Sequence, residues 1–338
     1  MQRKSRVAPL IAAILATMVG TASAVAAPAS GCGMVITQSM TLTADIGPCG
    51  RGGIVIAADD IDVDLGGHTI SGKDRSGDGV GILFDGVTGS RVLHGTVRGF
   101  DAGVAIVGGG SNTVWQLTIR DNIGSLTASR PAYGDGVVIH SSSLNWITRS
   151  TIFNNGPYGG ISVIGDAAMP SDNNVFDRNK IVDNDVDRAS SNENDGIRVE
   201  GPHAFGTTIM DNTILNNGRH GIALHSDELT PHPTYSTYIT RNIVQGNGFH
   251  AMANAKGDGI VVLGGKDALV FENEVIGNAA NGIRLGSVTS RILVNTAIGN
   301  ALYPGVSGAF DLNDENPGCA DNEWDSNVFG TASQACIA

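Results

Sequence analysis

The sequence predicts an all-β solenoid, a single-stranded parallel β-helix of about ten coils. Nine segments consist of a glycine followed by alternating inward and outward residues, and the glycines lie 28, 22, 33, 24, 36, 25, 38 and 23 residues apart. A short repeating period with insertions is typical of a solenoid, and the alternation indicates short strands with one buried face. No stretch has a convincing helical period. The segments begin at Gly53, Gly81, Gly103, Gly136, Gly160, Gly196, Gly221, Gly259 and Gly282.

Asparagine recurs at matching places in these units. A second strand follows most glycine segments, and four of these strands begin at Asn179, Asn212, Asn242 and Asn273. Other asparagines close a unit just before the next glycine segment, where a tight corner favours a left-handed backbone. Stacked amides can also exchange hydrogen bonds along the axis, which predicts an Asn ladder. The closing asparagines are Asn155, Asn184, Asn217, Asn247, Asn278 and Asn300.

The first 27 residues predict a signal peptide. Arg3, Lys4 and Arg6 precede an apolar run over residues 7–20, and small residues follow over 22–27. Such a run is shorter than the roughly 20 residues that a membrane-spanning helix needs. We therefore expect a β-helix domain over residues 28–338 that is secreted, extracellular or periplasmic, and without a membrane span. We also expect a monomer.

The charge of the chain excludes nucleic acid as a partner. The formal net charge is −12, and loss of three basic residues with the signal peptide changes it to 18 − 33 = −15. Nucleic-acid-binding proteins carry a basic surface instead. An acidic protein also repels a polyanion at long range, so an anionic substrate requires a local cationic patch or a bound metal ion.

The four cysteines predict two disulfides that close the ends of the domain. Cys32 and Cys49 lie near one end of the mature chain, and Cys319 and Cys336 lie near the other. In a stack of about ten coils the two ends are roughly 45 to 50 Å apart at the spacing of strands. Only the two local pairs can then come within the roughly 7 Å that a disulfide allows between Cα atoms.

Insertions predict a groove over the sheet formed by the glycine segments. Insertions in a solenoid fall on one face and often mark it as functional. Two of them follow a glycine segment, and three precede one, so together they would wall this sheet on both sides. The insertions cover residues 123–134, 186–194 and 249–256 before a segment, and 165–171 and 226–236 after one.

Polar residues concentrate in the middle of this predicted floor. Outward positions lie two and four residues after each glycine; near the ends they are apolar or small, as at Val55, Leu83, Ala105, Val261 and Leu263. Each polar residue has an alternative structural explanation: turn chemistry for Asp135 and Asp258, a surface ion pair for Arg198 with Glu200, and a filled corner for His220. The middle positions are Val138, His140, Ser162, Arg198, Glu200 and His225, and the turns before the glycines add Asp135, Asp195, Arg219, His220 and Asp258.

These repeats resemble the right-handed parallel β-helix superfamily, which includes pectate lyases, alginate-acting enzymes and NosD-like periplasmic proteins. Asn217-Gly-Arg-His-Gly-Ile222, with Asn194-Asp-Gly-Ile197 one coil earlier, is similar to the alginate C5-epimerase and lyase type, in which Asp-Gly and Arg-His-Gly contribute to the uronate site. That family's Tyr-Gly-Phe-Asp-Pro-His segment is incomplete here. Residues 133–135 retain part of it, and Tyr158-Gly-Gly160 is a competing candidate.

The resemblance implies a uronate-polymer lyase or C5-epimerase. Such a reaction abstracts the C5 proton while a cation neutralises the adjacent carboxylate. Arg198 or Arg219 would supply the cation, with protonated Asp195 or Ca²⁺ as alternatives, and His220 or a tyrosine would take the proton. His140, Tyr158, Glu200, His225, Asp135 and Asp258 are the expected substrate-binding residues.

Two other functions remain open. Glycoside hydrolysis needs two carboxyl groups about 5 to 9.5 Å apart, which Asp195 with Glu200, Asp135 or Asp258 can provide. A non-catalytic carbohydrate-binding solenoid is the third reading. The aromatic content of 5% argues against a large sugar-stacking platform, although Trp115, Trp146 and Tyr158 are candidate contacts.

Two acidic stretches raise the question of a metal. Dense carboxylates can hold Ca²⁺, but neither stretch has the spacing of a defined calcium loop, which favours solvated acidic loops. Copper delivery by analogy with NosD is not favoured, because the cysteines are expected in disulfides and no Met-His cluster occurs. The acidic residues are Asp183, Asp185, Asp187 and Asp195 in the first stretch, and Asp311, Asp314 and Glu315 in the second.

Overall fold

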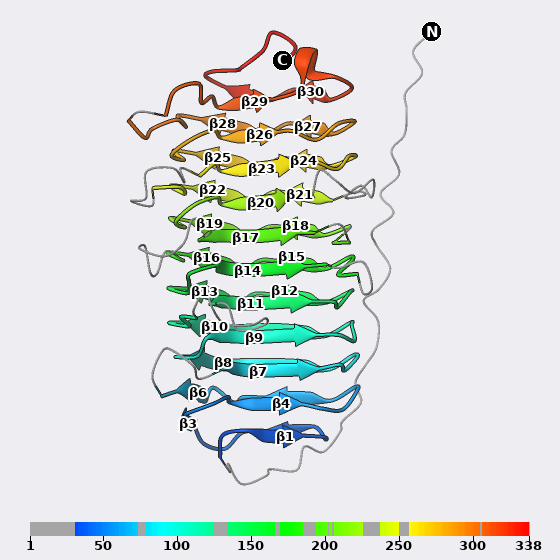
Figure 1. Cartoon of the computed structure of the whole chain (residues 1–338), viewed down its shortest axis with the longest axis vertical. Coiled ribbons are helices and arrows are strands. Elements are labelled where there is room, and N and C mark those ends of the chain that lie inside the picture. Colours follow the sequence, from blue (N-terminus) through cyan, green and yellow to red (C-terminus); the bar gives the residue numbers. More distant parts are fainter. Residues whose placement is uncertain are drawn as a thin grey trace.

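The chain forms a rod of stacked β-coils (Figure 1). The computed structural model describes residues 31–73, 79–124, 134–165, 170–184, 194–201, 203–204, 206–225, 237–249, 257–304 and 306–337. Three parallel sheets run along the rod, and successive coils contribute a strand to each. This confirms the predicted single-stranded parallel β-helix. The predicted signal peptide lies outside the described residues, and no described helix is long and apolar enough to cross a membrane.

Sheet A contains the glycine segments and has eleven strands, close to the expected ten coils. Its strands pair in register, so that residues at the same offset from each glycine form straight columns. The strands in order are β1 (Met34–Ile36), β4 (Ile54–Ile56), β7 (Val80–Asp85), β9 (Ala102–Val107), β11 (Asp135–His140), β14 (Gly159–Ile164), β17 (Asp195–Glu200), β20 (Ile222–His225), β23 (Ile260–Leu263), β26 (Ile283–Leu285) and β29 (Leu312–Asp314).

The other two sheets are formed by the remaining strands, and the long strands β8 (Arg91–Arg98) and β10 (Thr113–Arg120) belong to both. Sheet B also contains β2 (Met40–Thr41), β5 (Asp62–Asp64), β12 (Trp146–Thr148), β15 (Val175–Asp177), β18 (Thr208–Met210), β21 (Tyr238–Thr240), β24 (Leu269–Phe271), β27 (Arg291–Leu293) and β30 (Glu323–Asp325). Sheet C also contains β3 (Ile46–Cys49), β6 (Thr69–Gly72), β13 (Thr151–Phe153), β16 (Lys180–Val182), β19 (Thr213–Leu215), β22 (Ile243–Gln245), β25 (Glu274–Ile276), β28 (Thr296–Ile298) and β31 (Val328–Phe329); one 3₁₀ turn, η1, covers Pro317–Cys319.

The repeated glycines allow each coil to close tightly. Inward apolar side chains such as Val199 and Ile214 are buried in a continuous core along the rod. A Cβ at Gly196 would lie 2.5 Å from the carbonyl oxygen of Gly221 and 2.7 Å from Cγ2 of Ile214. No larger residue fits that gap without displacing backbone. The glycine of the repeat is therefore required by the close approach of successive coils.

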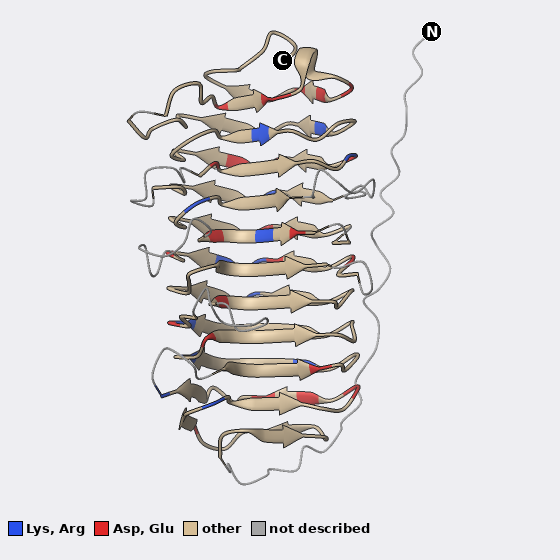
Figure 2. Ribbon diagram, in the orientation of Figure 1, with Lys and Arg blue, Asp and Glu red and all other residues tan. Residues whose placement is uncertain are grey.

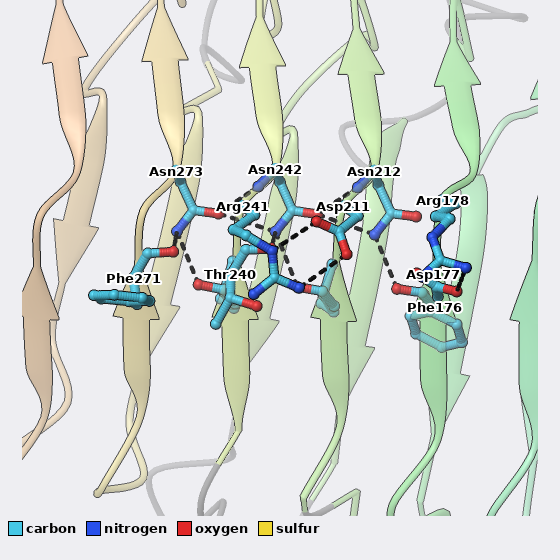
Figure 3. Close-up of polar contacts among 12 residues, drawn as sticks. Phe176, Asp177, Arg178, Asp211, Asn212, Thr240, Arg241, Asn242, Phe271 and Asn273 are labelled. Atoms are coloured by element: carbon cyan, nitrogen blue, oxygen red, sulfur yellow. Dashed lines mark hydrogen bonds and ion pairs between the residues drawn. The ribbon is translucent and has the colours of Figure 1, made fainter. Parts of the chain in front are cut away.

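The predicted Asn ladder is confirmed, and a second one runs beside it. In the second ladder the Nδ2 of Asn212 donates to Oδ1 of Asn242 at 3.0 Å, and Asn242 donates likewise to Asn273 at 2.9 Å (Figure 3). The residue before each Asn has a left-handed backbone, as at Asp211 with φ of 56° and Arg241 with φ of 54°. The first ladder joins Asn122, Asn155, Asn184, Asn217, Asn247, Asn278 and Asn300.

Both expected disulfides form, Cys32–Cys49 near β1 and Cys319–Cys336 at the C-terminal end. The prediction of a solvated acidic loop near that end is wrong for Asp311 and Asp314, whereas Glu315 is exposed. Asp311 and Asp314 are buried because their carboxylates accept hydrogen bonds of the terminal coils. Asp311 Oδ1 ends the first ladder by accepting Nδ2 of Asn300 at 3.0 Å. Asp314 Oδ2 accepts Nε1 of Trp324 at 2.8 Å.

Candidate active site

The turn residues before the glycines form a polar ladder of their own. Oδ1 of Asp195 accepts the backbone N–H of His220 at 2.9 Å. Nδ1 of His220 accepts the N–H of Asp258, and Oδ1 of Asp258 accepts the N–H of Asn281, each at 2.9 Å. All four side chains are buried. Asp195, His220 and Asp258 therefore have a structural role, as the turn and corner explanations proposed for Asp258 and His220 anticipated.

The hydrogen bond to His220 fixes its tautomer. A ring nitrogen that accepts an N–H carries no proton, so the proton of the neutral ring lies on Nε2. Nε2 is buried and has no partner among the described residues. Asp258 Oδ2 lies 3.4 Å from Nδ1, but an unprotonated nitrogen forms no ion pair with it. His220 is consequently a hydrogen-bond donor at Nε2, and the expectation that it takes a proton is wrong for this geometry.

Two arginines on the outer face of sheet A are each held by two carboxylates. Nε of Arg198 donates to Glu200 at 2.8 Å and Nη1 donates to Asp195 at 3.2 Å. The Arg198 side chain is only 12% exposed, so this is not an ordinary surface ion pair. Figure 2 shows acidic positions on both sides of a basic one along β17.

Arg284 repeats the arrangement three coils later. Its Nε donates to Asp258 Oδ2 at 2.8 Å and its Nη1 to Glu315 Oε1 at 3.1 Å. Sequence reasoning missed Arg284, although it lies two residues after Gly282 and the rule used for outward positions selects it. Sequence reasoning also missed Asn281, which continues the ladder of turn residues after Asp258. The identity of a single turn residue does not indicate which backbone N–H its side chain will accept.

The two arginines delimit a patch of small and histidine side chains. Arg198 pairs with Ala223, Ala223 with Val261, and Val261 with Arg284, which places the arginines about 14 Å apart along the rod. His225 pairs with Glu200, beside Ala223. The rings of His225 and His220 lie 6.0 Å apart between centroids, and the Nε2 of His225 is also buried without a described partner.

Burial dominates the electrostatics of this patch. It raises the pKa of Asp195 to about 6, against the opposing effects of Arg219 and Arg198. It lowers the pKa of His220 well below its usual value and that of His225 to about 3, and the nearby arginines lower both further. Both histidines are therefore neutral at pH 7.

The predicted cationic floor is corrected accordingly, since Arg198 and Arg284 are each neutralised by two carboxylates. Arg219 precedes His220 and forms no ion pair with a described residue. It is half-buried and contributes positive charge at Asp195 and at both histidines. Among the described residues, Arg219 is thus the cation of the patch that no carboxylate neutralises.

The remaining predicted residues lie further along sheet A. Tyr158 precedes β14, and its carbonyl accepts the N–H of Asp195 at 3.1 Å, so it is one coil away. Asp135 and His140 are at the two ends of β11, two coils before β17. Asp135 is buried and accepts the hydroxyl of Ser162 at 2.5 Å. The group brought together is Asp195, Arg198, Glu200, Arg219, His220, His225 and Asp258, whereas Asp135 and His140 lie outside it.

The structure leaves two expectations open. Most of each insertion expected to wall the groove lies outside the described residues, as do Asp185 and Asp187 of the first acidic stretch. Within the described part of the chain, no group of three or more His, Cys, Asp or Glu side chains is arranged to hold a metal ion. Asp195 itself is occupied by Arg198 and the N–H of His220.

The chain belongs to the family described as the right handed beta helix region, whose model matches residues 31–187, 134–296 and 188–337. No curated protein matches it. Among solved structures it is similar to the Dettilon tailspike protein, with 17% identity and a TM-score of 0.53, over 91% of this chain and 59% of the tailspike.

Two further structures have the same fold. The Agl-KA catalytic domain is 15% identical with a TM-score of 0.56, over 87% of this chain and 54% of that one. DFA-IIIase from Arthrobacter chlorophenolicus A6, without its lid, is 12% identical with a TM-score of 0.51, over 88% and 71%. This chain thus spans little more than half the length of the tailspike and of Agl-KA. At these identities the similarity shows the fold alone.

Proposed function

We propose that this chain is a secreted carbohydrate-active enzyme, a lyase or C5-epimerase that acts on a uronate polymer bound across sheet A between β17 and β26. One observation carries the proposal: two buried neutral histidines, whose Nε2 atoms have no partner among the described residues, lie between carboxylate-held arginines and beside Arg219, which forms no ion pair with a described residue. Buried polar atoms without partners require an explanation, and a polar ligand provides one. The N-terminal sequence and the two disulfides support export.

The roles follow from charge and tautomer. Arg219, assisted by Arg198, neutralises the uronate carboxylate, and His220 donates its Nε2–H to a carboxylate oxygen as charge builds there. His225 accepts the C5 proton at Nε2, in the tautomer protonated on Nδ1. An incoming carboxylate also raises the pKa of His225 toward the range a base requires, because it opposes the effect of the arginines.

The electron pair left at C5 then determines the product. In a lyase it forms the C4–C5 double bond while the C4–O4 bond breaks and O4 receives a proton. In an epimerase it accepts a proton on the opposite face of C5. Tyr158, whose backbone carbonyl accepts the N–H of Asp195, is the predicted residue that would supply that proton.

Hydrolysis has less support from the geometry. It requires one carboxyl group to protonate the leaving oxygen and a second to act as base or nucleophile. Both oxygens of Asp195 and both of Asp258 accept hydrogen bonds within the protein. Glu200 is paired with Arg198. None of these carboxylates is available without breaking an arginine contact.

The test incubates the mature protein with alginate, polygalacturonate and neutral glycans. Ultraviolet absorbance detects unsaturated ends, a reducing-sugar assay detects any cleavage, and NMR in D₂O detects deuterium at C5. We expect turnover of a uronate polymer that falls about 100-fold or more in His225→Ala and Arg219→Ala. Arg291→Ala is the control, since Arg291 pairs with Glu323 on sheet B at the surface.

Three outcomes refute the proposal. Cleavage without unsaturated ends, on neutral glycans, indicates hydrolysis. Binding without cleavage or C5 exchange on any glycan indicates a docking protein. Full uronate turnover in His225→Ala and Arg219→Ala removes the assigned site.

A further inference from the structure

Sheet B exposes two aromatic rings in one straight column. Trp146 pairs with Val175, Val175 with Thr208, and Thr208 with Tyr238. Trp146 is 44% exposed and Tyr238 42%, although residues between them in the column are half-buried. The column places the rings about 14 Å apart along the rod axis. Aromatic side chains that remain this exposed on a flat sheet are typical of a binding surface.

A basic corner runs beside this column. Arg149, Arg178 and Arg241 occupy the left-handed corner between sheets B and C, and Lys180 begins β16. Figure 3 shows Arg178 and Arg241 at this corner with their acidic neighbours. Arg241 is bidentate on Asp211, at 2.8 and 2.9 Å, and Arg178 lies 3.4 Å from Asp177. Arg149 is exposed and forms no ion pair with a described residue.

The local charge is opposite to that of the whole protein. From Trp146 to Phe153, Val175 to Val182, Thr208 to Leu215 and Tyr238 to Gln245 the chain has four basic and two acidic residues, 4 − 2 = +2. The complete chain has a net charge of −12. A positive strip within an acidic surface attracts a polyanion locally.

We propose that this surface, the Trp146 face, is a second, non-catalytic docking site for an acidic polysaccharide, and the proposal rests on the proposed function for the class of polymer. The Trp146 face consists of Trp146, Tyr238, Arg149, Arg178 and Arg241. The two rings stack on sugar rings of one chain lying parallel to the rod. Arg149, which forms no ion pair with a described residue, pairs with a carboxylate of that chain, and Arg178 and Arg241 contribute positive charge beside it. Thr208, between the rings, adds a hydroxyl to the same column.

Such a site acts through effective concentration. It lies on a different sheet from the proposed active site, so a long polymer can occupy both while a short oligosaccharide occupies one. Holding part of a polymer against the rod makes its next engagement with sheet A intramolecular. The low aromatic content argues against an extended platform, but two rings at this spacing suffice for one chain.

The first experiment compares Trp146→Ala/Tyr238→Ala with Ile298→Ala, which removes an equally exposed apolar side chain from sheet C. Calorimetry measures binding of long alginate and long polygalacturonate, with dextran as the neutral probe. We expect the double variant to bind the acidic polymers about tenfold more weakly and the control to be unchanged. Arg149→Ala should weaken binding in low salt and have little effect in high salt.

A second readout locates the polymer. Of the three tryptophans, Trp146 is exposed, Trp115 is half-buried and Trp324 is 6% exposed, so acrylamide quenches Trp146 preferentially. Acidic polymer should reduce the acrylamide quenching of the wild-type fluorescence and should not change the quenching measured in Trp146→Ala. Turnover of short uronate oligosaccharides should be the same in the double variant as in the wild type, which separates docking from catalysis.

The outcomes distinguish this proposal from the proposed function. Absence of turnover with Trp146 still protected removes the enzyme and leaves the docking site. Full affinity in the double variant, no protection of Trp146, or no binding of either polymer overturns the docking site. Sedimentation tests a contact between two copies of this chain. If the wild type self-associates, the double variant does not, and the affinity for polymer is unchanged, the docking site is overturned in favour of that contact.

Discussion

Replacing Asn212 by alanine tests how much a single ladder residue stabilises the rod. Oδ1 of Asn212 accepts the N–H of Asn179 at 2.9 Å and its Nδ2 at 3.1 Å. Nδ2 of Asn212 donates to the carbonyl of Phe176 at 2.9 Å and to Asn242 at 3.0 Å (Figure 3). All four contacts are buried, so no water replaces them.

The magnitude follows from which groups lose every partner. Nδ2 of Asn179 keeps the carbonyl of Ile147, and Oδ1 of Asn242 keeps the backbone N–H of residue 212. The backbone N–H of Asn179 has no other acceptor and remains buried. One unsatisfied donor costs about 1 to 3 kcal/mol, and the other lost bonds cost about 1 kcal/mol each. We expect the free energy of unfolding to fall by about 4 to 6 kcal/mol.

Urea unfolding followed by circular dichroism measures this change, with the m-value as a check on cooperativity. Gln245→Ala is the control, because Gln245 carries an exposed amide on the outer face of β22 in sheet C. Hydrogen exchange should become faster in the coils on both sides of Asn212, since each coil of a solenoid is stabilised by its neighbours. A loss below about 1 kcal/mol would refute the ladder as a stabilising element.

Three further predictions concern single positions. Gly196→Ala should destabilise the protein by about 2 kcal/mol or more in the same urea assay, because its Cβ would lie 2.5 Å from a carbonyl oxygen, whereas Gly50→Ala meets nothing within 4 Å and should be neutral. Burial raises the pKa of Asp195 from 3.8 to about 6, so its neutral form stabilises the fold fully below pH 3.8 and this contribution is lost as the pH rises through 6. The free energy of unfolding of the wild type should therefore fall by about 3 kcal/mol between pH 4 and 7, and Asp195→Asn should remove this fall. Equal pH profiles of stability in the two proteins would contradict the prediction. Replacing Cys319 and Cys336 by serine should cost about 3 kcal/mol in unfolding free energy, and an unchanged midpoint would argue against that disulfide.

Periodic features of the fold were predictable from the sequence, because each coil repeats the same local chemistry. The glycine intervals, the closing asparagines and the local cysteine pairs depend on spacing alone. Side-chain partners were not predictable in the same way. The tautomer of His220 depends on the N–H of Asp258, which lies 38 residues later in the sequence, and the spacing does not show that the two residues meet. The Trp146 face depends on register across three coils, which no local pattern indicates.

Buried acidic residues show a second limit. A carboxylate in a loop is usually solvated, and that rule led to the wrong environment for Asp311 and Asp314. Both lie in the C-terminal coils, where Oδ1 of Asp311 accepts Nδ2 of Asn300, Oδ2 of Asp311 accepts the N–H of Thr331, and Oδ2 of Asp314 accepts Nε1 of Trp324. A carboxylate accepts several N–H groups at once, which makes it a suitable end for a ladder of amides.

The structural role and the proposed chemical role coincide at His220, and one substitution separates them. His220→Ala removes the acceptor of the Asp258 N–H and destabilises the ladder, so its loss of activity would be ambiguous. His220→Asn retains an acceptor, as Asn281 does two coils later by accepting the N–H of Phe310, but it lacks a ring Nε2–H. We expect His220→Asn to keep the free energy of unfolding within about 1 kcal/mol and to lose uronate turnover about 100-fold. A stable variant with full turnover would show that the buried Nε2–H contributes nothing to the reaction, while an unstable one would show that position 220 requires the imidazole ring for packing.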